Sequence, residues 1–197
     1  MKARTAWAAV ADIAGKGIPA ALLLTYTRAF FRQSVRRTQS PAAIARSLSD
    51  ALLSDTGGNP YVTCIIAAFD LDRRVLTCTN AGHPPAVVVG PDGPQSLGAD
   101  GPPAGLLASV SYGERQVPLR EGDVGVFVTD GITEGFDGDL ATIAAALRQK
   151  PHVTGRALAD AVCADLFDLA SRSSGPAGLD GWSDDRTVLA FAVGPRR

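Results

Sequence analysis

The sequence predicts an α+β protein in which two sheets pack against each other and helices cover them on the outside. After one short strand the chain has two helical segments, a run of short strands follows, and two more helices precede a last strand. Because strands and helices do not alternate, a doubly wound parallel sheet is disfavoured. Some of the strands are apolar on both faces, which is typical of strands that are covered on both sides, as between two packed layers.

The first predicted strand ends at an acidic residue beside a tight turn. Residues 6–11 are small and apolar, as in a short buried strand. Asp12 follows, and Gly15 and Gly17 then permit a tight backbone turn. Pro19 lies in the first turn of the next helix, where a missing N–H does no harm. Asp12 therefore lies near a helix N-terminus, an end that favours anions, although an ordinary helix-start aspartate explains it equally well on its own.

Two helices are predicted after this turn. The first covers residues 18–37, and its apolar side chains form one stripe: Ile18, Leu22, Tyr26 and Phe30. Its arginines fall mostly on the other side and toward the end, where cations suit the helix dipole. Ser40 is the expected N-cap of the second helix, with Pro41 at its first position, and this helix reaches about residue 54.

After residue 60 the pattern of apolar residues changes from one typical of helices to one typical of strands. Residues 61–71 are apolar on both faces and rich in branched side chains, and residues 75–81 return as a partner strand. Further strands are predicted at residues 84–90, 110–119, 124–129 and 187–193. Residues 95–108, rich in Gly and Pro, are expected to hold little regular structure, and helices are predicted at 139–150 and 154–171.

Composition indicates one ordinary globular domain spanning residues 1–197. Hydrophobic residues make up 46% and charged residues 20% of the chain, and 19 Lys+Arg against 20 Asp+Glu leave no field that would recruit nucleic acid or an anionic membrane. No apolar run is long enough for a membrane span or a secretory signal. The three cysteines lack paired spacing, so we expect buried thiols in a reducing compartment and a cytoplasmic protein.

Two further acidic turns repeat the pattern at Asp12. Asp130 ends an apolar strand and is followed by Gly131, and Asp184 and Asp185 directly precede the last strand. Each alone is more easily explained as a turn residue. Together, at strand ends, they could converge, and three carboxylates would repel one another unless cations held them. Oxygen ligands without nearby His or Cys favour Mg²⁺ or Mn²⁺.

Five sequence blocks, in order, carry a resemblance to a known family. They are ADIAGKGIPAALL around Asp12, NAGHPP (residues 80–85), GPPAGL (residues 101–106), VTDGITEGFD around Asp130, and DDRTVLAF from Asp184. Together they resemble the metal-dependent serine/threonine phosphatases of the PPM (type 2C) superfamily, in the bacterial SpoIIE/RsbU branch. Ala104 stands where that branch has Leu.

The resemblance implies an α-β-β-α sandwich, with two mainly antiparallel sheets flanked by helices, that holds two Mg²⁺ or Mn²⁺ ions. By this likeness Asp12 bridges both ions and the carbonyl of Ile13 is an additional ligand. Asp130 holds one ion and Asp184 the other, and Asp185 is the less favoured member of the acidic pair. A water bridging the ions would attack the phosphate in line.

Other positions depart from the family pattern or have an open role. Ala14 stands where eukaryotic relatives have a His that could assist departure of the leaving group. His83 is either a general acid or a structural histidine, and Glu134 is expected to brace the Asp130 turn. The branch usually has a G-G-D-[WFY]-x-D segment before the Asp12 strand, and these residues do not occur here. We therefore expect a domain that lacks the usual N-terminal strands. The Asp12 strand would then lie at a sheet edge, and pairing through that edge could give a homodimer.

The function that the resemblance implies is hydrolysis of phosphoserine or phosphothreonine on a regulatory protein of the anti-anti-sigma (STAS) type. A catalytically weak or silent protein-binding module of the same fold is the alternative. It is favoured by the missing leading segment and disfavoured by the retained Asp12, Asp130 and Asp184. A metal-dependent nuclease would also use clustered carboxylates, but no basic groove is indicated.

Overall fold

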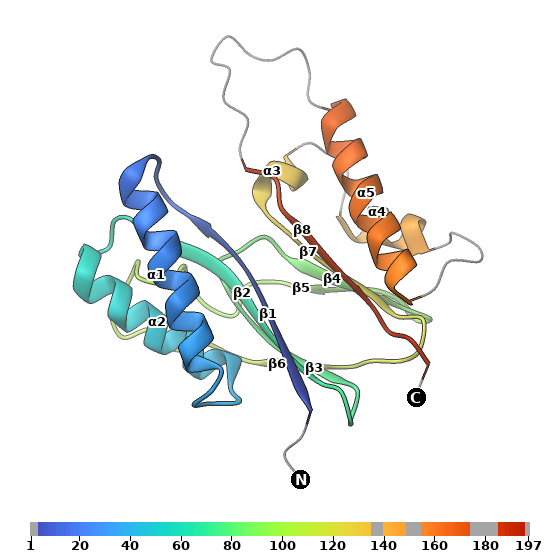
Figure 1. Ribbon diagram of the computed structural model, residues 1–197, viewed down its shortest axis with the longest axis horizontal. Helices are drawn as coiled ribbons and strands as arrows, with labels where there is room; N and C mark the ends of the chain where they lie inside the picture. The colour runs from blue at the N-terminus through green and yellow to red at the C-terminus, as the bar shows by residue number, and fades with distance from the viewer. Residues whose placement is uncertain (1–3, 135–139, 149–154, 174–184, 196–197) are drawn as a thin grey trace. The chain divides into compact units, whose positions relative to one another are not determined.

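The computed structural model describes residues 4–134, 140–148, 155–173 and 185–195 and forms two compact units (Figure 1). The first unit consists of residues 1–83 and 98–118, and the second of residues 84–97 and 119–197. Each unit contains one four-stranded sheet in which all neighbouring strands are antiparallel. The prediction of an α+β protein with two mainly antiparallel sheets is confirmed.

The first unit holds the sheet β1-β2-β3-β6 and two helices. Its elements are β1 (Thr5–Ile13), α1 (Ile18–Ser34), α2 (Pro41–Thr56), β2 (Val62–Asp70), β3 (Val75–Ala81) and β6 (Arg115–Pro118). Among the described residues β1 pairs only with β2, so the strand that carries Asp12 is an edge strand, as predicted. The expected strand over residues 110–119 is confined to four residues of β6.

The core of the first unit lies between one face of its sheet and the two helices. Ile44, Leu48 and Leu52 of α2 pack against Val62 and Cys64 of β2, and all five are at most 2% exposed. The hydroxyl of Ser40 accepts a hydrogen bond from the N–H of Ala43 at 3.0 Å, which confirms the predicted N-cap of α2. Burial of this apolar face fixes which side of β2 meets the helices.

The apolar stripe predicted for α1 is not its packing face. Ile18 and Leu22 are 77% and 67% exposed, whereas Leu23, Phe30 and Phe31 pack against the core of the first unit. The packing face of α1 is therefore turned from the stripe that the sequence suggested, and only Phe30 belongs to both. Helical periodicity shows that a helix has an apolar stripe, but tertiary packing decides which stripe is used.

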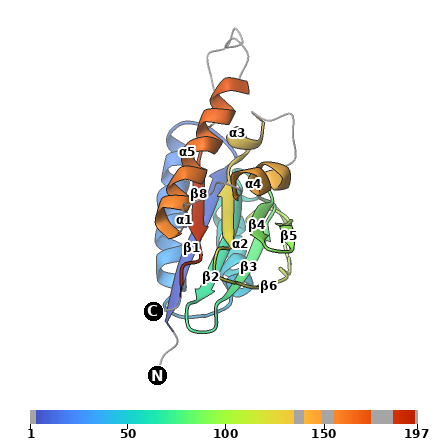
Figure 2. The ribbon, with the colours of Figure 1, turned by 90° about the vertical axis from the view of Figure 1, so that its right-hand side faces the viewer.

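The second unit holds the sheet β5-β4-β7-β8, and β7 lies between β4 and β8 (Figure 2). Its elements are β4 (Ala86–Gly90), β5 (Gly93–Leu97), β7 (Val124–Val128), α3 (Asp130–Thr133), α4 (Leu140–Arg148), α5 (Gly155–Ser173) and β8 (Val188–Ala192). Val126 and Val128 of β7 pack with Leu147 of α4 and with Val162 and Leu166 of α5 in a second core.

Two expectations for the second unit were wrong. Gly93–Leu97 forms strand β5, although residues 95–97 were expected to lie in an irregular stretch, because this segment pairs with β4 and buries Leu97 completely. Asp130–Thr133 forms the short helix α3 rather than a simple turn. Strand β5 forms by pairing with the neighbouring strand β4, and α3 forms through local hydrogen bonds to the carbonyls of Thr129 and Asp130.

The cysteines are mostly buried, as predicted. Cys64 and Cys78 are at most 2% exposed, whereas Cys163 is only half-buried, which departs from the expectation for that residue. Burial raises the pKa of the Cys64 thiol to about 12, and burial with the nearby Asp100 carboxylate raises that of Cys78 to about 12. Burial also raises the pKa of Cys163.

We predict that the native protein at pH 8 reacts slowly with a thiol-specific disulfide reagent. A thiol whose pKa lies well above the solution pH stays protonated, and the thiolate is the reactive form. In denaturant all three cysteines should react rapidly, and a spectrophotometric thiol titration measures both states. Rapid native labelling of Cys64 or Cys78, located by mass spectrometry, would contradict this picture of their environment.

Candidate functional site

Asp12 is delivered by the edge strand β1 to the turn that begins α1. It is half-buried and lies opposite Thr63 of β2, and the pairing continues past the strand because Ala14 N–H donates to Tyr61 O at 3.0 Å. Gly15 and Gly17 then have φ of 128° and 78°, values that L side chains rarely adopt. These glycines let the chain reverse from β1 into α1 directly after Asp12 and Ile13.

Thr63 is held by the turn that contains His83. Its hydroxyl lies 2.9 Å from Nδ1 of His83, whose side chain is only 4% exposed. The fully buried Asn80 supports this turn with both ends of its amide: Oδ1 accepts from His83 N–H at 2.8 Å, and Nδ2 donates to His83 O at 3.0 Å. Gly82 has φ of 66°, and a Cβ on it would lie 2.7 Å from the backbone nitrogen of Pro103. Within the first unit, the buried His83 therefore supports Thr63 through the contact between its Nδ1 and the Thr63 hydroxyl.

Replacing Asn80 by Ala is predicted to lower the free energy of unfolding by about 2–4 kcal/mol. The change leaves a buried N–H and a buried carbonyl of His83 without their partner, and each such loss costs about 1–3 kcal/mol. Urea denaturation followed by circular dichroism measures the change. Thr25→Ala is the control, because its hydroxyl bond to Ala21 O is exposed, and we expect a change below about 0.5 kcal/mol. Equal effects of the two variants would contradict the assignment.

Asp130 stands where β7 ends and α3 begins. It is half-buried, its Oδ1 accepts from Gly131 N–H at 2.9 Å, and its carbonyl accepts from Glu134 N–H at 2.8 Å. The brace expected from Glu134 is thus made by its backbone. Within the described residues no lysine or arginine forms an ion pair with Asp130.

The segment before β8 lies beside Asp130. Thr129 is 3% exposed, and its hydroxyl donates to Asp185 O at 2.9 Å and accepts from Thr187 N–H at 2.9 Å. Asp185 itself is exposed, and Asp184 lies outside the described residues. The structure thus ties the Asp185 backbone to Thr129, the residue before Asp130, within the second unit, while Asp12 and Ile13 belong to the first.

The oxygen donors fit a hard divalent cation. Carboxylates of Asp12, Asp130 and Asp185 and the carbonyl of Ile13 are ligands of the kind that Mg²⁺ and Mn²⁺ prefer. Within the residues that the structure describes, no three His, Cys, Asp or Glu side chains gather into a group that could hold a metal. Asp184, the expected third carboxylate, falls in the segment from 174 to 184 that is not described.

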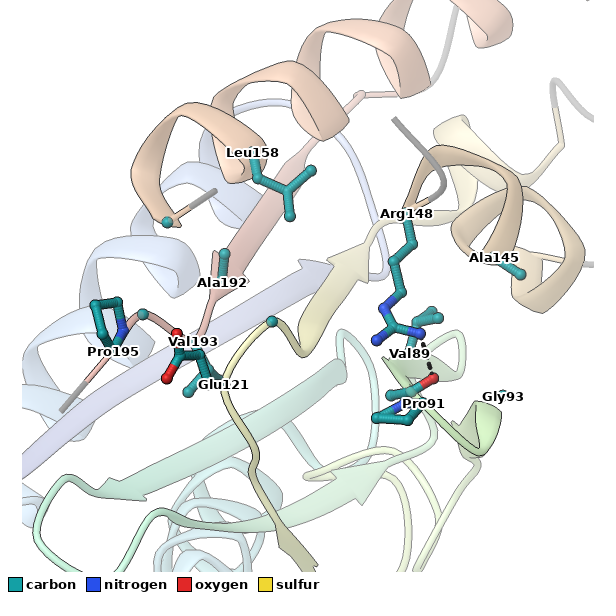
Figure 3. Close-up of a pocket in the computed structure, with 14 residues that line it drawn as sticks. Val89, Pro91, Gly93, Glu121, Ala145, Arg148, Leu158, Ala192, Val193 and Pro195 are labelled. Atoms are coloured by element: carbon teal, nitrogen blue, oxygen red, sulfur yellow. Dashed lines mark hydrogen bonds between the residues drawn. The ribbon is translucent and has the colours of Figure 1, made fainter. Parts of the chain in front are cut away.

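A cavity of about 770 Å³ in the second unit lies away from these residues (Figure 3). Its walls include Val89, Glu121, Leu158 and Ala192, and Arg148 Nη1 donates to Gly90 O at 2.6 Å on one side. Gly122 on its wall precedes β7, whereas Asp130 follows β7, so the length of that strand, roughly 17 Å, separates them. This cavity is therefore not part of the candidate site.

Comparison with known proteins identifies the family. The sequence model of the family called stage II sporulation protein E (SpoIIE) matches residues 2–194 of this chain. The chain belongs to the SpoIIE family. It is 27% identical over 128 residues to the phosphoserine phosphatase RsbU of Bacillus subtilis, a match that covers 64% of this chain and 38% of that protein. The chain thus spans well under two thirds of this relative.

Solved structures share its fold. The RsbU and RsbW domains of a Mycobacterium tuberculosis protein match with a TM-score of 0.79 at 22% identity, over 99% of this chain and 55% of that one. The PP2C phosphatase domain of Bacillus subtilis SpoIIE, with a fragment of its regulatory domain, matches with 0.78 at 18% identity, over 96% and 55%. The catalytic domain of the phosphatase PstP, solved with two manganese ions, matches with 0.65 at 16% identity, over 95% and 87%. The predicted PPM-type fold is confirmed.

The sequence singles out the acidic residues as candidates but not the residues that hold their backbones. Thr129 and Thr63 were not singled out, although Thr129 directly precedes Asp130 at the end of an apolar strand. A buried hydroxyl at such a position is a usable signal, because it must find hydrogen-bond partners. No helix among the described residues is long and apolar enough to cross a membrane.

Proposed function

We propose that this domain hydrolyses phosphoserine or phosphothreonine on a regulatory protein. The observation that carries the proposal is the placement of Asp12 and Asp130, each half-buried at the end of a strand and beside a helix start. The match to the SpoIIE family over residues 2–194 and the name of the Bacillus subtilis relative support it. We further propose that residues 1–197 act as one catalytic domain.

Two Mg²⁺ or Mn²⁺ ions are the proposed cofactors, supported by the oxygen donor set and by the two manganese ions in the related PstP structure. Asp12 and the carbonyl of Ile13 would hold ions from the first unit. Asp130 and Asp184 would hold them from the second, with Asp185 as the less favoured alternative. When bound, such ions neutralise phosphate oxygens and lower the pKa of water, which supplies a nucleophile near neutral pH.

The protein's own residues position this chemistry. Gly15 and Gly17 expose backbone at the start of α1, and no side chain among the described residues caps that helix. Its first N–H groups can therefore orient an anionic phosphate. The Gly131 N–H holds one oxygen of Asp130 and so orients the carboxylate. Ala14 cannot transfer a proton, so a histidine at this position does not protonate the leaving serine or threonine oxygen here.

The proposed substrate is a phosphorylated regulatory partner of the anti-anti-sigma type, in the cytoplasm. The family supports this choice of substrate. The net charge of −1 gives no reason to expect a nucleic-acid substrate. A silent binding module remains the second candidate, because β1 is an edge strand on which the site depends. Metal-dependent turnover of a phosphopeptide distinguishes the two functions.

Asp12→Asn is predicted to abolish Mn²⁺-dependent phosphate release while the protein stays folded. The amide removes the charge that a shared metal ligand supplies, and even outer partners of metal ligands contribute 10- to 100-fold, so we expect a loss of more than about 100-fold. Phosphate release from a phosphoserine peptide measures it, with circular dichroism as the check on folding. Asp50→Asn, on the exposed side of α2, is the matched control and should keep its rate. Wild-type turnover by Asp12→Asn would refute the role of Asp12.

Asp184→Ala is predicted to weaken Mn²⁺ binding more than Asp185→Ala does. The resemblance of the closing block to the family pattern supports the first acid of the pair as the ligand. Isothermal titration calorimetry on the two variants gives both affinities. The reverse order would move the ligand to Asp185.

A further inference from the structure

The hydroxyl of Thr129 joins the end of β7 to the segment that precedes β8. It donates to Asp185 O and accepts from Thr187 N–H, both at 2.9 Å, and the side chain is 3% exposed. Both partners are backbone groups, so these hydrogen bonds fix the position of the backbone at Asp185 and Thr187. Asp130 follows Thr129 directly, and Asp184 directly precedes Asp185.

This hydroxyl takes the place of a carbonyl in the ladder between β7 and β8. The two strands are antiparallel with Val128 opposite Val188, so Thr129 and Thr187 would form the next pair. Thr129 N–H does donate to Thr187 O at 3.2 Å. In a regular hydrogen-bonded pair the Thr187 N–H would return to Thr129 O. It goes to the Thr129 hydroxyl instead.

The carbonyl of Thr129 is thereby released to begin a helix. It accepts from Ile132 N–H at 3.0 Å, which is the first turn of α3. A single carbonyl pointing along the ladder could not also point along the helix, whereas the side chain supplies a second acceptor at the same residue. The chain therefore leaves the sheet at Asp130 while the segment before β8 stays attached, and every backbone group named here has a partner.

We propose that Thr129 is a positioning residue that sets where the Asp185 backbone lies relative to Asp130. Its hydroxyl fixes the backbone at Asp185 relative to the first residue of α3. The inference rests on the proposed metal-dependent function. A change of Thr129 should therefore act on metal binding although Thr129 is not itself a ligand.

The test compares variants that keep or remove the hydroxyl. Thr129→Val preserves shape but leaves the Asp185 carbonyl and the Thr187 N–H without their partner. We expect its Mn²⁺ affinity, measured by calorimetry on the whole chain, to fall about 10- to 100-fold, the range for outer partners of metal ligands. Thr129→Ser keeps the hydroxyl and should restore affinity to within about threefold of the unaltered protein.

Thr79→Val is the matched control for loss of a buried threonine hydroxyl. Thr79 is fully buried, and its hydroxyl donates to Gly113 O at 2.8 Å in the first unit. We expect a lowered melting temperature comparable to that of Thr129→Val but an unchanged Mn²⁺ affinity. A purely structural role of Thr129 would make the two variants alike in both measurements, and that result would overturn the inference.

Asp130→Asn separates this inference from the proposed function. If Asp130→Asn loses Mn²⁺ binding while Thr129→Val retains it, the metal site stands and the role of Thr129 is wrong. If Asp130→Asn binds Mn²⁺ normally, the metal site is wrong and the inference falls with it. Should Thr129→Val not fold, amide hydrogen exchange on the unaltered protein decides. Protection of the Thr187 amide close to that of Leu189, whose residue forms the next hydrogen-bonded pair of the ladder with Phe127, supports the hydroxyl bond, and exchange at the rate of an open amide overturns it.

Discussion

A carboxylate can stand rigidly at the end of a strand only if the backbone beyond the ladder still finds hydrogen-bond partners. Both described acidic turns meet this constraint, each in its own way. At Asp12 the Ala14 N–H continues the pairing to Tyr61, and two glycines then reverse the chain. At Asp130 the Thr129 hydroxyl replaces a carbonyl, so that the ladder and helix α3 are both satisfied. In each unit the helices that pack on the sheet hold these strand ends in position.

Burial supplies the rigidity on which those turns depend. In the first unit Leu48 and Leu52 of α2 press on β2, and in the second Val162 and Leu166 of α5 press on the sheet that contains β7. The polar supports are buried as well: Asn80 is fully enclosed and Thr129 is 3% exposed. A buried hydrogen bond whose partner is lost costs more than an exposed one, so these residues resist displacement. The result is two preformed turns, each presenting a half-buried carboxylate.

Most of the fold was predictable because period and composition act locally. The strand Val75–Ala81 was predicted as the partner that returns after the preceding strand, and the cap at Ser40 from the preference of serine for that position. Strand β5 was not predictable in the same way, since Gly93–Leu97 becomes a strand only because β4 lies beside it. The stripe of α1 was misassigned because two candidate apolar faces existed and packing selected the one with Leu23 and Phe31.

The sequence by itself determined the family, the two-sheet class and the acidic residues of the candidate site, because these depend on residue types at given spacings. The tertiary structure alone decided what supports those residues. Thr129 meets Asp185 across 56 positions and Thr63 meets His83 across 20, and no local rule predicts such partners. The physical reason is that a hydrogen bond at a strand end is made with whichever backbone or side chain the completed sheet brings within about 3 Å.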